Sequence, residues 1–407
     1  MIIFSLCFLL FINAMSIGLV FPIFASLFFA PEGSIFAADV SSYLKVLSYS
    51  MILALPNICM IFGAPFLGRM SDHVGRKNVL FLGLIGVAVS FLLSAFSIFF
   101  GSLLLLFISR ALAGFMDGSE GVAQAAIADI SLPKEKARHM GYATFAGTIG
   151  FIIGPVVGGF LAEQKITGQY HFEIPFLASF LLTLVNAIML YCYFPKQPAS
   201  HDYPKKISYL TILNRGFVIL FDKRIRLYSL LLFVLQWSLA AFYQLCILFL
   251  VGQFNYSSGE VGLFTMFLGC CFSGGIFFVI HVFLDRFKHI HLLKGGIGFL
   301  LLSLLNALFL RHSVLFPWTS VIPMMLGIAM MYNVLLSFLS NAVSDKEQGD
   351  VMGSGTSLKA LGWLSSGLFI SWLYPNVIAI LIVMLGIALV ALVSSRKIHP
   401  IDSSTSH

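Results

Sequence analysis

The stretch that decides the fold is GAPFLGRMSDHVGRKNVLFLG, residues 63–83, in which a short polar segment separates two long apolar runs. The polar segment contains Gly68, Asp72, Gly75 and the basic pair Arg76 and Lys77. Glycine permits a tight reversal of the chain, and the runs on both sides are long enough to cross a bilayer. The segment therefore predicts a short cytoplasmic turn between two membrane-spanning helices.

The composition points to lipid as the solvent of this chain. Of its 407 residues, 59% are hydrophobic and only 10% are charged, and the mean hydropathy is +0.97. Such a chain exposes too much apolar surface to be a soluble globular protein. The net charge of +7 would suit nucleic acid, but the charges lie in loops and mostly on one side, so we expect no nucleic-acid partner.

Twelve apolar stretches are long enough to span a membrane, since a span needs about 20 residues. They cover residues 2–29, 44–67, 78–99, 102–127, 140–162 and 174–194 in the first half, and residues 227–251, 259–283, 292–310, 315–341, 351–373 and 376–395 in the second. This pattern predicts an all-α polytopic membrane protein. We expect an N-terminal six-helix bundle over residues 1–195, a cytoplasmic linker over 196–226, a C-terminal six-helix bundle over 227–395 and a cytoplasmic tail over 396–407.

The orientation follows from the basic residues, which are retained on the cytoplasmic side. Of the 24 Lys and Arg residues, Lys45, Lys165 and Arg311 fall in loops on one side, and Arg110 and Lys359 fall inside spans. The remaining 19 fall on the other side. Both termini and the linker are therefore expected in the cytoplasm.

The loop from Gly68 to Lys77 resembles the G-x-L-S-D-R-x-G-R-K loop of the major facilitator superfamily. The resemblance implies the major facilitator fold, with two pseudo-symmetric six-helix bundles that rock about a site at the membrane midplane. It also implies a cytoplasmic gate, formed here by Gly68, Asp72, Gly75, Arg76, Lys77 and Asp129. A weaker copy of the loop, residues 284–288, lies at the corresponding place in the second half.

Two motifs within spans narrow the resemblance. Arg110 to Gly114 resembles the R-x-x-x-G motif of the superfamily, and the fifth span resembles the G-x-x-x-G-P-x-x-G-G motif of its drug:proton antiporters. The residues of this antiporter motif are Gly150, Gly154, Pro155, Gly158 and Gly159. Glycines four residues apart are also common wherever membrane helices touch, so close packing alone is the other interpretation. The whole chain is most similar to the tetracycline-exporter-like group with twelve helices.

Two departures from that group bear on mechanism. Asn13 stands where those exporters have an Asp in the first span, and Ser90 stands where they have one in the third. Neither side chain holds a transferable proton, so we do not expect tetracycline as the substrate.

The fourth span offers replacement acids. Asp117 follows Arg110 by seven residues, about two helical turns, and Glu120 lies about one turn further on, so all three are expected on one helix face. A charge inside the membrane is costly and marks a functional site by default. We predict that Asp117 or Glu120 carries a coupling proton beside Arg110. A fixed Arg110–Asp117 bridge between helices and direct substrate contact remain the alternatives.

Other polar and aromatic side chains within spans are candidates for a central substrate cavity, although each alone is also typical of an interhelical hydrogen bond. They are Asn13, Gln124, Gln236, Trp237, Tyr243, Gln244, Tyr332 and Asn333.

These observations predict a secondary active transporter that works by alternating access. Its expected activity is proton-coupled efflux of a small amphipathic molecule, such as a drug, a metabolite or a siderophore. Proton symport or facilitated uptake is the alternative, and a transporter-like receptor or scaffold is the alternative of another class. We find no catalytic motif and no metal-ligand spacing, so we expect no enzyme activity, no metal and no cofactor. The chain is expected as a monomer in a bacterial inner membrane, with substrate, protons and lipid as its partners.

Overall fold

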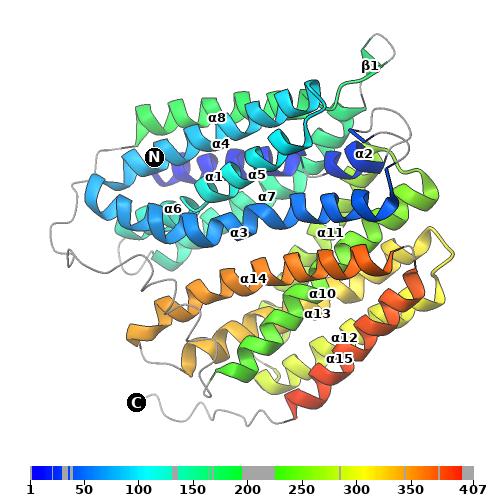
Figure 1. Cartoon of the computed structure of the whole chain (residues 1–407). Helices are drawn as coiled ribbons and strands as arrows, with labels where there is room; N and C mark the ends of the chain where they lie inside the picture. Colours follow the sequence, from blue (N-terminus) through cyan, green and yellow to red (C-terminus); the bar gives the residue numbers. More distant parts are fainter. Residues whose placement is uncertain are drawn as a thin grey trace. The chain divides into compact units, whose positions relative to one another are not determined.

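The computed structural model describes residues 2–20, 22–29, 35–36, 40–130, 136–163, 165–166, 169–194, 225–283, 286–342, 345–374 and 376–396. Residues 196–224 of the predicted linker, residues 397–407 of the predicted tail and residues 284–285 lie outside these ranges. The described chain is almost entirely helical (Figure 1). Two antiparallel strands of two residues each, β1 (Lys165–Ile166) and β2 (Gln169–Tyr170), lie between helices α7 and α8.

The first half contains eight helices, of which four follow single predicted spans and the other four are two pairs that divide the first and the fourth predicted span. They are α1 (Ile2–Val20), α2 (Ile23–Phe29), α3 (Ser42–Val74), α4 (Arg76–Phe99), α5 (Leu103–Asp117), α6 (Glu120–Ile130), α7 (Lys136–Ala162) and α8 (Ile174–Tyr193). The predicted first span is divided into α1 and α2, and Pro22, which lacks the backbone N–H donor of a helix interior, lies just before α2. The predicted fourth span is also divided, between Asp117 and Glu120, and this corrects the single helix expected there.

The second half follows the predicted spans equally well. Its helices are α10 (Arg226–Phe254), α11 (Ser258–Phe278) with a π-helical end η1 (Val279–Phe283), α12 (His289–Phe309), α13 (Leu315–Asn341), α14 (Asp345–Leu373) and α15 (Val377–Ser395). The bounds of α13 equal the predicted ones.

Ten helical segments in the described part of the chain are long and apolar enough to cross a membrane. The two predicted spans that do not meet this criterion have identifiable reasons. The fourth is divided into α5 and α6, and α14 carries Lys359 and several Ser and Gly residues that lower its hydropathy. The all-α polytopic architecture is thus the one predicted.

The helices cluster into two compact units. One comprises Met1–Asn214 with Ile247–Gly269, and the other comprises Arg215–Cys246 with Cys270–His407. Within the first, α1 packs on α7 and α8, and α5 packs on α3 and α4. Within the second, α12 packs on α13 and α15. Both α10 and α11 contribute to both units, whereas the sequence places these helices in the second bundle; the predicted bundle boundaries stay a prediction.

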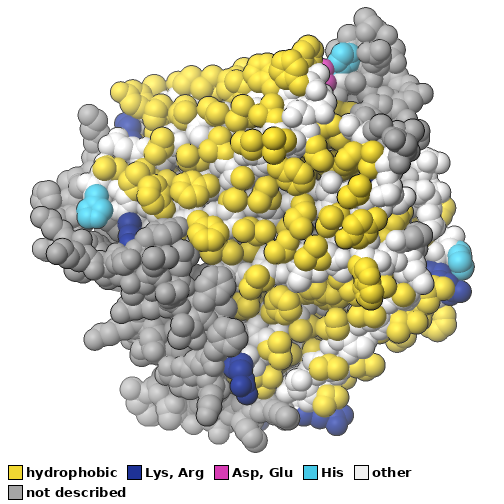
Figure 2. Space-filling view, in the orientation of Figure 1, with side chains coloured by type: hydrophobic (Ala, Val, Ile, Leu, Met, Phe, Trp, Pro, Cys, Tyr) yellow, Lys and Arg dark blue, Asp and Glu magenta, His cyan; other side chains and the backbone are white. Residues whose placement is uncertain are grey.

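The surface of the helices suits a lipid environment. Large apolar side chains such as Phe99, Phe309 and Trp372 are more than 70% exposed. Figure 2 shows that hydrophobic side chains cover most of the described surface on this face, while the basic and histidine side chains lie toward its margins. Apolar patches of this extent are unfavourable in water and favourable in hydrocarbon.

Candidate functional site

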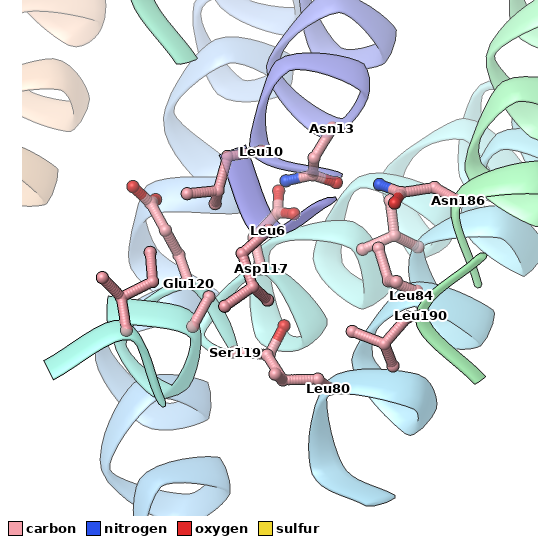
Figure 3. A pocket seen from close by; sticks show the side chains of 13 residues that line it. Leu6, Leu10, Asn13, Leu80, Leu84, Asp117, Ser119, Glu120, Asn186 and Leu190 are labelled. Atoms are coloured by element: carbon pink, nitrogen blue, oxygen red, sulfur yellow. The ribbon is translucent and has the colours of Figure 1, made fainter. Parts of the chain in front are cut away.

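A small cavity inside the first unit brings together most of the polar side chains predicted for its spans (Figure 3). It is lined by Leu6, Leu10 and Asn13 of α1, Leu80, Leu84 and Val87 of α4, Asp117 and Ser119 at the end of α5, Glu120, Ala123 and Ile127 of α6, and Asn186 and Leu190 of α8. Apolar side chains form most of the wall. Ionisable side chains at such a place within membrane-spanning segments mark a candidate functional site.

The interruption between α5 and α6 places the two acids in different electrostatic surroundings. Asp117 is the last residue of α5, where the partial negative charge of the helix end disfavours a carboxylate. Glu120 lies in the first turn of α6, where the helix end favours one, and its side chain is exposed. The two predicted proton carriers therefore lie at helix ends of opposite partial charge.

The backbones of α5 and α3 pack closely at this point. A Cβ on Gly118 would overlap the backbone of Ala64, and one on Gly114 would overlap the backbone of Pro56, both in α3. Gly63 of α3 meets the carbonyl group of Phe115 in the same way. These contacts hold the end of α5 tightly against α3, and only residues without a side chain permit them.

Arg110 is buried in α5 and is held by aromatic rings and one hydroxyl group. Its side chain is 5% exposed. Its Nη2 donates to Oγ of Ser94 at 2.8 Å, and its guanidinium lies 5.7, 5.6 and 5.8 Å from the ring centroids of Phe24, Phe91 and Phe176. Three desolvated cation–π contacts of this kind offset part of the cost of burying the charge. Its Nε has no hydrogen-bond partner among the described residues.

Arg110 and Asp117 are close enough for their charges to interact, as the sequence predicts. Nothing in the structure distinguishes a fixed bridge from a proton site, so the role of the pair stays a prediction. The three phenyl rings around Arg110 are absent from the sequence prediction, because 42 Phe residues give no local signal for the three that matter.

Two asparagines line the cavity from opposite helices. Asn13 of α1 is a predicted cavity residue, and Asn186 of α8, which is fully buried, is not among those predicted. An Asn within an otherwise apolar span is the signal that could have identified Asn186. In Figure 3 the amide nitrogen of Asn13 lies on the side of the carboxyl group of Asp117, and the amide oxygen lies on the other side. Oδ1 of Asn13 accepts no hydrogen bond from the described residues.

The glycines of the predicted antiporter motif form the contact between α7 and α1. A Cβ on Gly158 would overlap the carbonyl oxygen of Leu19, and one on Gly150 would overlap that of Phe11. A Cβ on Gly154 would lie 2.6 Å from the carbonyl oxygen of Met15. These three glycines, spaced by four residues, let the two backbones touch along about two helical turns.

The remaining motif residues meet the beginning of α11. A Cβ on Gly159 would overlap the carbonyl oxygen of Ser258, and one on Gly262 would overlap that of Pro155. Beyond the end of α7, the carboxylate of Glu163 accepts a hydrogen bond from the backbone N–H of Gly259 at 2.7 Å. The motif therefore joins α7 to two helices, α1 and α11, within one compact unit.

In the predicted cytoplasmic gate, the backbone conformation requires glycine at position 75 but not at position 68. Gly75 joins α3 to α4 with φ 90°, a conformation that other residues rarely adopt. Gly68 lies inside α3, and a Cβ there would meet no described atom within 4 Å. The predicted role of Gly68 in the gate stays a prediction.

The other gate residues make local contacts. Nη1 of Arg76 donates to Oγ of Ser71, and Nζ of Lys77 lies 5.2 Å from the ring centroid of Tyr191. The side chains of Asp72 and Asp129 lie outside the described residues, so their predicted roles stay predictions.

The predicted cavity residues of α10 lie in aromatic and amide contacts with α14. Trp237 packs on Phe369 with ring centroids 5.0 Å apart, and Tyr243 packs on Trp363 at 6.0 Å. Nε2 of Gln244 donates to Oγ of Ser366 at 3.3 Å. Gln236 is buried beside Gly362, and Tyr332 of α13 is half-buried. The side chains of Gln124 and Asn333 lie outside the described residues.

The described residues contain no cluster of three His, Cys, Asp or Glu side chains suited to a metal ion. The expected absence of a metal and of a cofactor stays a prediction.

Comparison with known proteins extends these observations over the whole chain. A model described as "Major Facilitator Superfamily" matches residues 6–367. Tetracycline resistance protein, class H, of Pasteurella multocida is 24% identical over 378 residues, which cover 90% of this chain and 88% of that protein. Multidrug resistance protein 1 of Bacillus subtilis is 27% identical over 392 residues, 93% of each chain.

Solved structures agree on the fold. The xylose transporter XylE from E. coli, in an inward open conformation, superimposes with a TM-score of 0.73 at 16% identity, covering 99% of this chain and 98% of that one. At this identity the likeness concerns the fold alone, and it confirms the predicted major facilitator fold.

Proposed function

Because the chain belongs to the Major Facilitator Superfamily, we propose that it is a secondary active transporter that exports a small amphipathic molecule in exchange for protons. The observation that carries this proposal is the α7 motif, whose glycines hold α1 and the beginning of α11 against one helix. The resistance proteins named above, which match about nine-tenths of the chain, support the same direction of transport.

The proposed proton carrier is Asp117, with Arg110 as the charge that responds to its protonation. Asp117 lines a cavity, lies at the unfavourable end of a helix and interacts with a buried cation. When Asp117 is ionised, the two charges attract, and when it is protonated, Arg110 relies on its aromatic neighbours and Ser94. A proton thus changes the balance of contacts between helices of one unit.

Alternating access gives the remaining motif residues their proposed roles. The segment from Gly68 to Lys77, with Asp129, is proposed to fasten the cytoplasmic side. The contact of Glu163 with Gly259, reinforced by a 2.6 Å hydrogen bond from Ser258 to Ser26, is proposed to fasten the opposite side. Each set would open while the other is closed.

The lost family acids argue against tetracycline as the cargo. Asn13 cannot ionise, and the hydroxyl group of Ser90 donates within its own helix to the carbonyl oxygen of Val87 at 2.7 Å. The same loss admits proton symport as the alternative direction. We further propose a monomer without enzyme activity in a bacterial inner membrane, with both termini in the cytoplasm.

Metabolite profiling followed by vesicle transport tests the proposal. Compounds that accumulate in cells lacking the gene are assayed in everted membrane vesicles, with tetracycline as a parallel probe. An acidic lumen should drive uptake of the accumulating compound into the vesicles, because protons leave in exchange, and should leave tetracycline unmoved. Release from an acidified lumen would indicate symport, and the absence of transport with either gradient would overturn a proton-coupled function.

A further inference from the structure

The second compact unit contains an exposed lysine within a membrane-spanning helix. Lys359 lies in α14, about four helical turns beyond the first residue of this helix, Asp345, and its side chain is exposed. A cation inside a span is costly unless it faces the interior of the bundle or a water-filled cavity, and such a residue marks a functional site. The face of α14 on which Lys359 lies therefore decides what it can do.

Lys359 lies on the face of α14 that packs on α10. Gly362 and Trp363 follow it by three and four residues, a spacing that places side chains on one helix face. A Cβ on Gly362 would lie 3.0 Å from the backbone nitrogen of Trp237 in α10, and the rings of Trp363 and Tyr243 of α10 are 6.0 Å apart. Figure 1 shows α14 beside α10, and these residues all belong to the second unit.

The opposite face of α14 is the one suited to lipid. Leu361, Leu368 and Trp372 are exposed, and their spacing of seven and four residues places them in one apolar stripe. Lys359 precedes Leu368 by nine residues, about two and a half turns, so the two side chains point in opposite directions. The exposed ammonium group of Lys359 therefore faces open space on the α10 side of the helix, away from the apolar stripe.

Trp363 supplies a second donor on the same face. Its Nε1 is buried and has no hydrogen-bond partner among the described residues. A buried donor without an acceptor is unfavourable, and a tryptophan N–H, like a lysine ammonium group, donates hydrogen bonds and accepts none. Side chains four residues apart on a helix are neighbours, so one group with several acceptor oxygens can reach both donors.

We propose that Lys359 and Trp363 bind an acidic group of the exported molecule, which makes the substrate an amphipathic organic anion with an aromatic body. Its carboxylate accepts hydrogen bonds from Nζ of Lys359 and Nε1 of Trp363. Its body packs against the aromatic side chains that α10 and α14 bring together, which include Trp237 and Phe369 with ring centroids 5.0 Å apart.

The charge pattern of the second unit disfavours a cationic substrate. Its spans contain no Asp or Glu over residues 227–246, 270–283, 292–310, 315–341, 351–373 and 376–395. Export of an anion in exchange for a proton also moves positive charge inward, so a membrane potential that is negative inside favours it.

The proposal rests on the transport activity proposed above, and ligand binding tests it separately. The full-length protein in lipid nanodiscs is equilibrated with labelled 1-naphthoate or with its neutral counterpart, 1-naphthamide, and binding to empty nanodiscs is subtracted. The native protein should bind 1-naphthoate about tenfold more tightly than 1-naphthamide. Lys359→Met, which keeps an unbranched side chain without the charge, should lose this preference and bind 1-naphthamide as before, whereas Lys359→Arg should keep the preference.

Two further variants complete the test. Trp363→Phe keeps an aromatic ring without the N–H group and should weaken binding of 1-naphthoate severalfold. Lys294→Met is the matched control, because Lys294 is an exposed lysine of α12 in the same unit, and it should keep the preference. Lys359→Gln replaces the Met variant if that variant does not fold.

The outcomes separate the site from the transport activity. Equal affinity of the native protein for the two probes, or an undiminished preference in the Lys359 variants, overturns the anion site; proton-driven flux of the profiled compound in the same preparation then leaves the exporter intact. A preference that depends on Lys359, without proton-driven flux of any anion, supports the site and overturns the proposed function.

Discussion

The carboxylate of Glu163, one residue beyond α7, accepts a hydrogen bond of 2.7 Å from the backbone N–H of Gly259 at the beginning of α11. The approach depends on the missing side chain at position 259, because a Cβ there would lie 2.8 Å from Oε1 of Glu163. Charge-assisted hydrogen bonds to a helix N-terminus are among the stronger polar contacts. This contact joins an element of the first half of the chain to one of the second.

Gly259→Ala should therefore release the carboxylate and favour the state that is open on this side. Ser26→Cys, introduced after replacement of the native cysteines, reports the change by its reaction with a membrane-impermeant maleimide. Labelling should rise severalfold in Gly259→Ala and in Glu163→Gln. Gly274→Ala, in the same helix but with open space around it, should label at the starting rate, and equal labelling of all three variants would contradict the proposed role of the contact.

The two glycines of the α3–α4 segment should respond oppositely to alanine. Gly75→Ala forces a Cβ into φ 90°, which costs about 1–2 kcal/mol, and it should lower the unfolding temperature and the transport rate. Gly68→Ala fills open space in a helix interior and should be neutral or stabilising by up to about 1 kcal/mol. Thermal unfolding in detergent compares the two variants. An equal fall of the unfolding temperature in both would mean that the positive φ at position 75 does not determine the stability of this segment.

The α1–α7 contact predicts a strong dependence on glycine along one face of α7. Gly158→Ala drives a methyl group into the backbone of Leu19, and overpacking of this kind costs about 1–3 kcal/mol. Gly147→Ala, about three turns from Gly158 on the same helix, meets no described atom within 4 Å and provides the control. Expression level and unfolding temperature should fall only in Gly158→Ala.

The buried guanidinium of Arg110 depends on a hydroxyl group in a neighbouring helix. Ser94→Ala removes the acceptor for Nη2 and should reduce transport about tenfold, since a hydrogen bond to a charged group contributes about 1.5–3 kcal/mol. Ser97→Ala removes a hydroxyl group that is bonded to the carbonyl oxygen of Ser94 and should have a smaller effect. If the two variants transport equally, the hydrogen bond does not set the position of Arg110.

The sequence predicts the helices of this fold better than their interruptions. Hydropathy places α13 and most other spans within a few residues, because apolar length is a local property. The break lies where Gly118 meets the backbone of Ala64, more than 50 residues away in the chain. An Ala–Gly–Ser composition in a span is compatible with either a continuous or a divided helix, so a local pattern could not predict it.

The sequence likewise predicts some residues of the candidate site and misses others. Arg110, Asp117 and Asn13 are predictable, because charged and amide side chains are conspicuous in apolar spans. The contact between Glu163 and Gly259 is not, since an acid at the end of a span is typical of any solvated loop. The contact becomes evident only in the structure, because Gly259 is 96 residues from Glu163 in the chain.

Transport driven by an imposed pH jump in proteoliposomes tests the central claim most directly. The compound identified by profiling is assayed with the native protein, Asp117→Asn and Glu120→Gln, beside exchange of labelled for unlabelled compound without a gradient. Asp117→Asn should lose at least tenfold of the proton-driven flux and retain the exchange, because substrate still binds when the carrier cannot release a proton; Glu120→Gln should retain both. Unchanged proton-driven flux in Asp117→Asn would contradict the account.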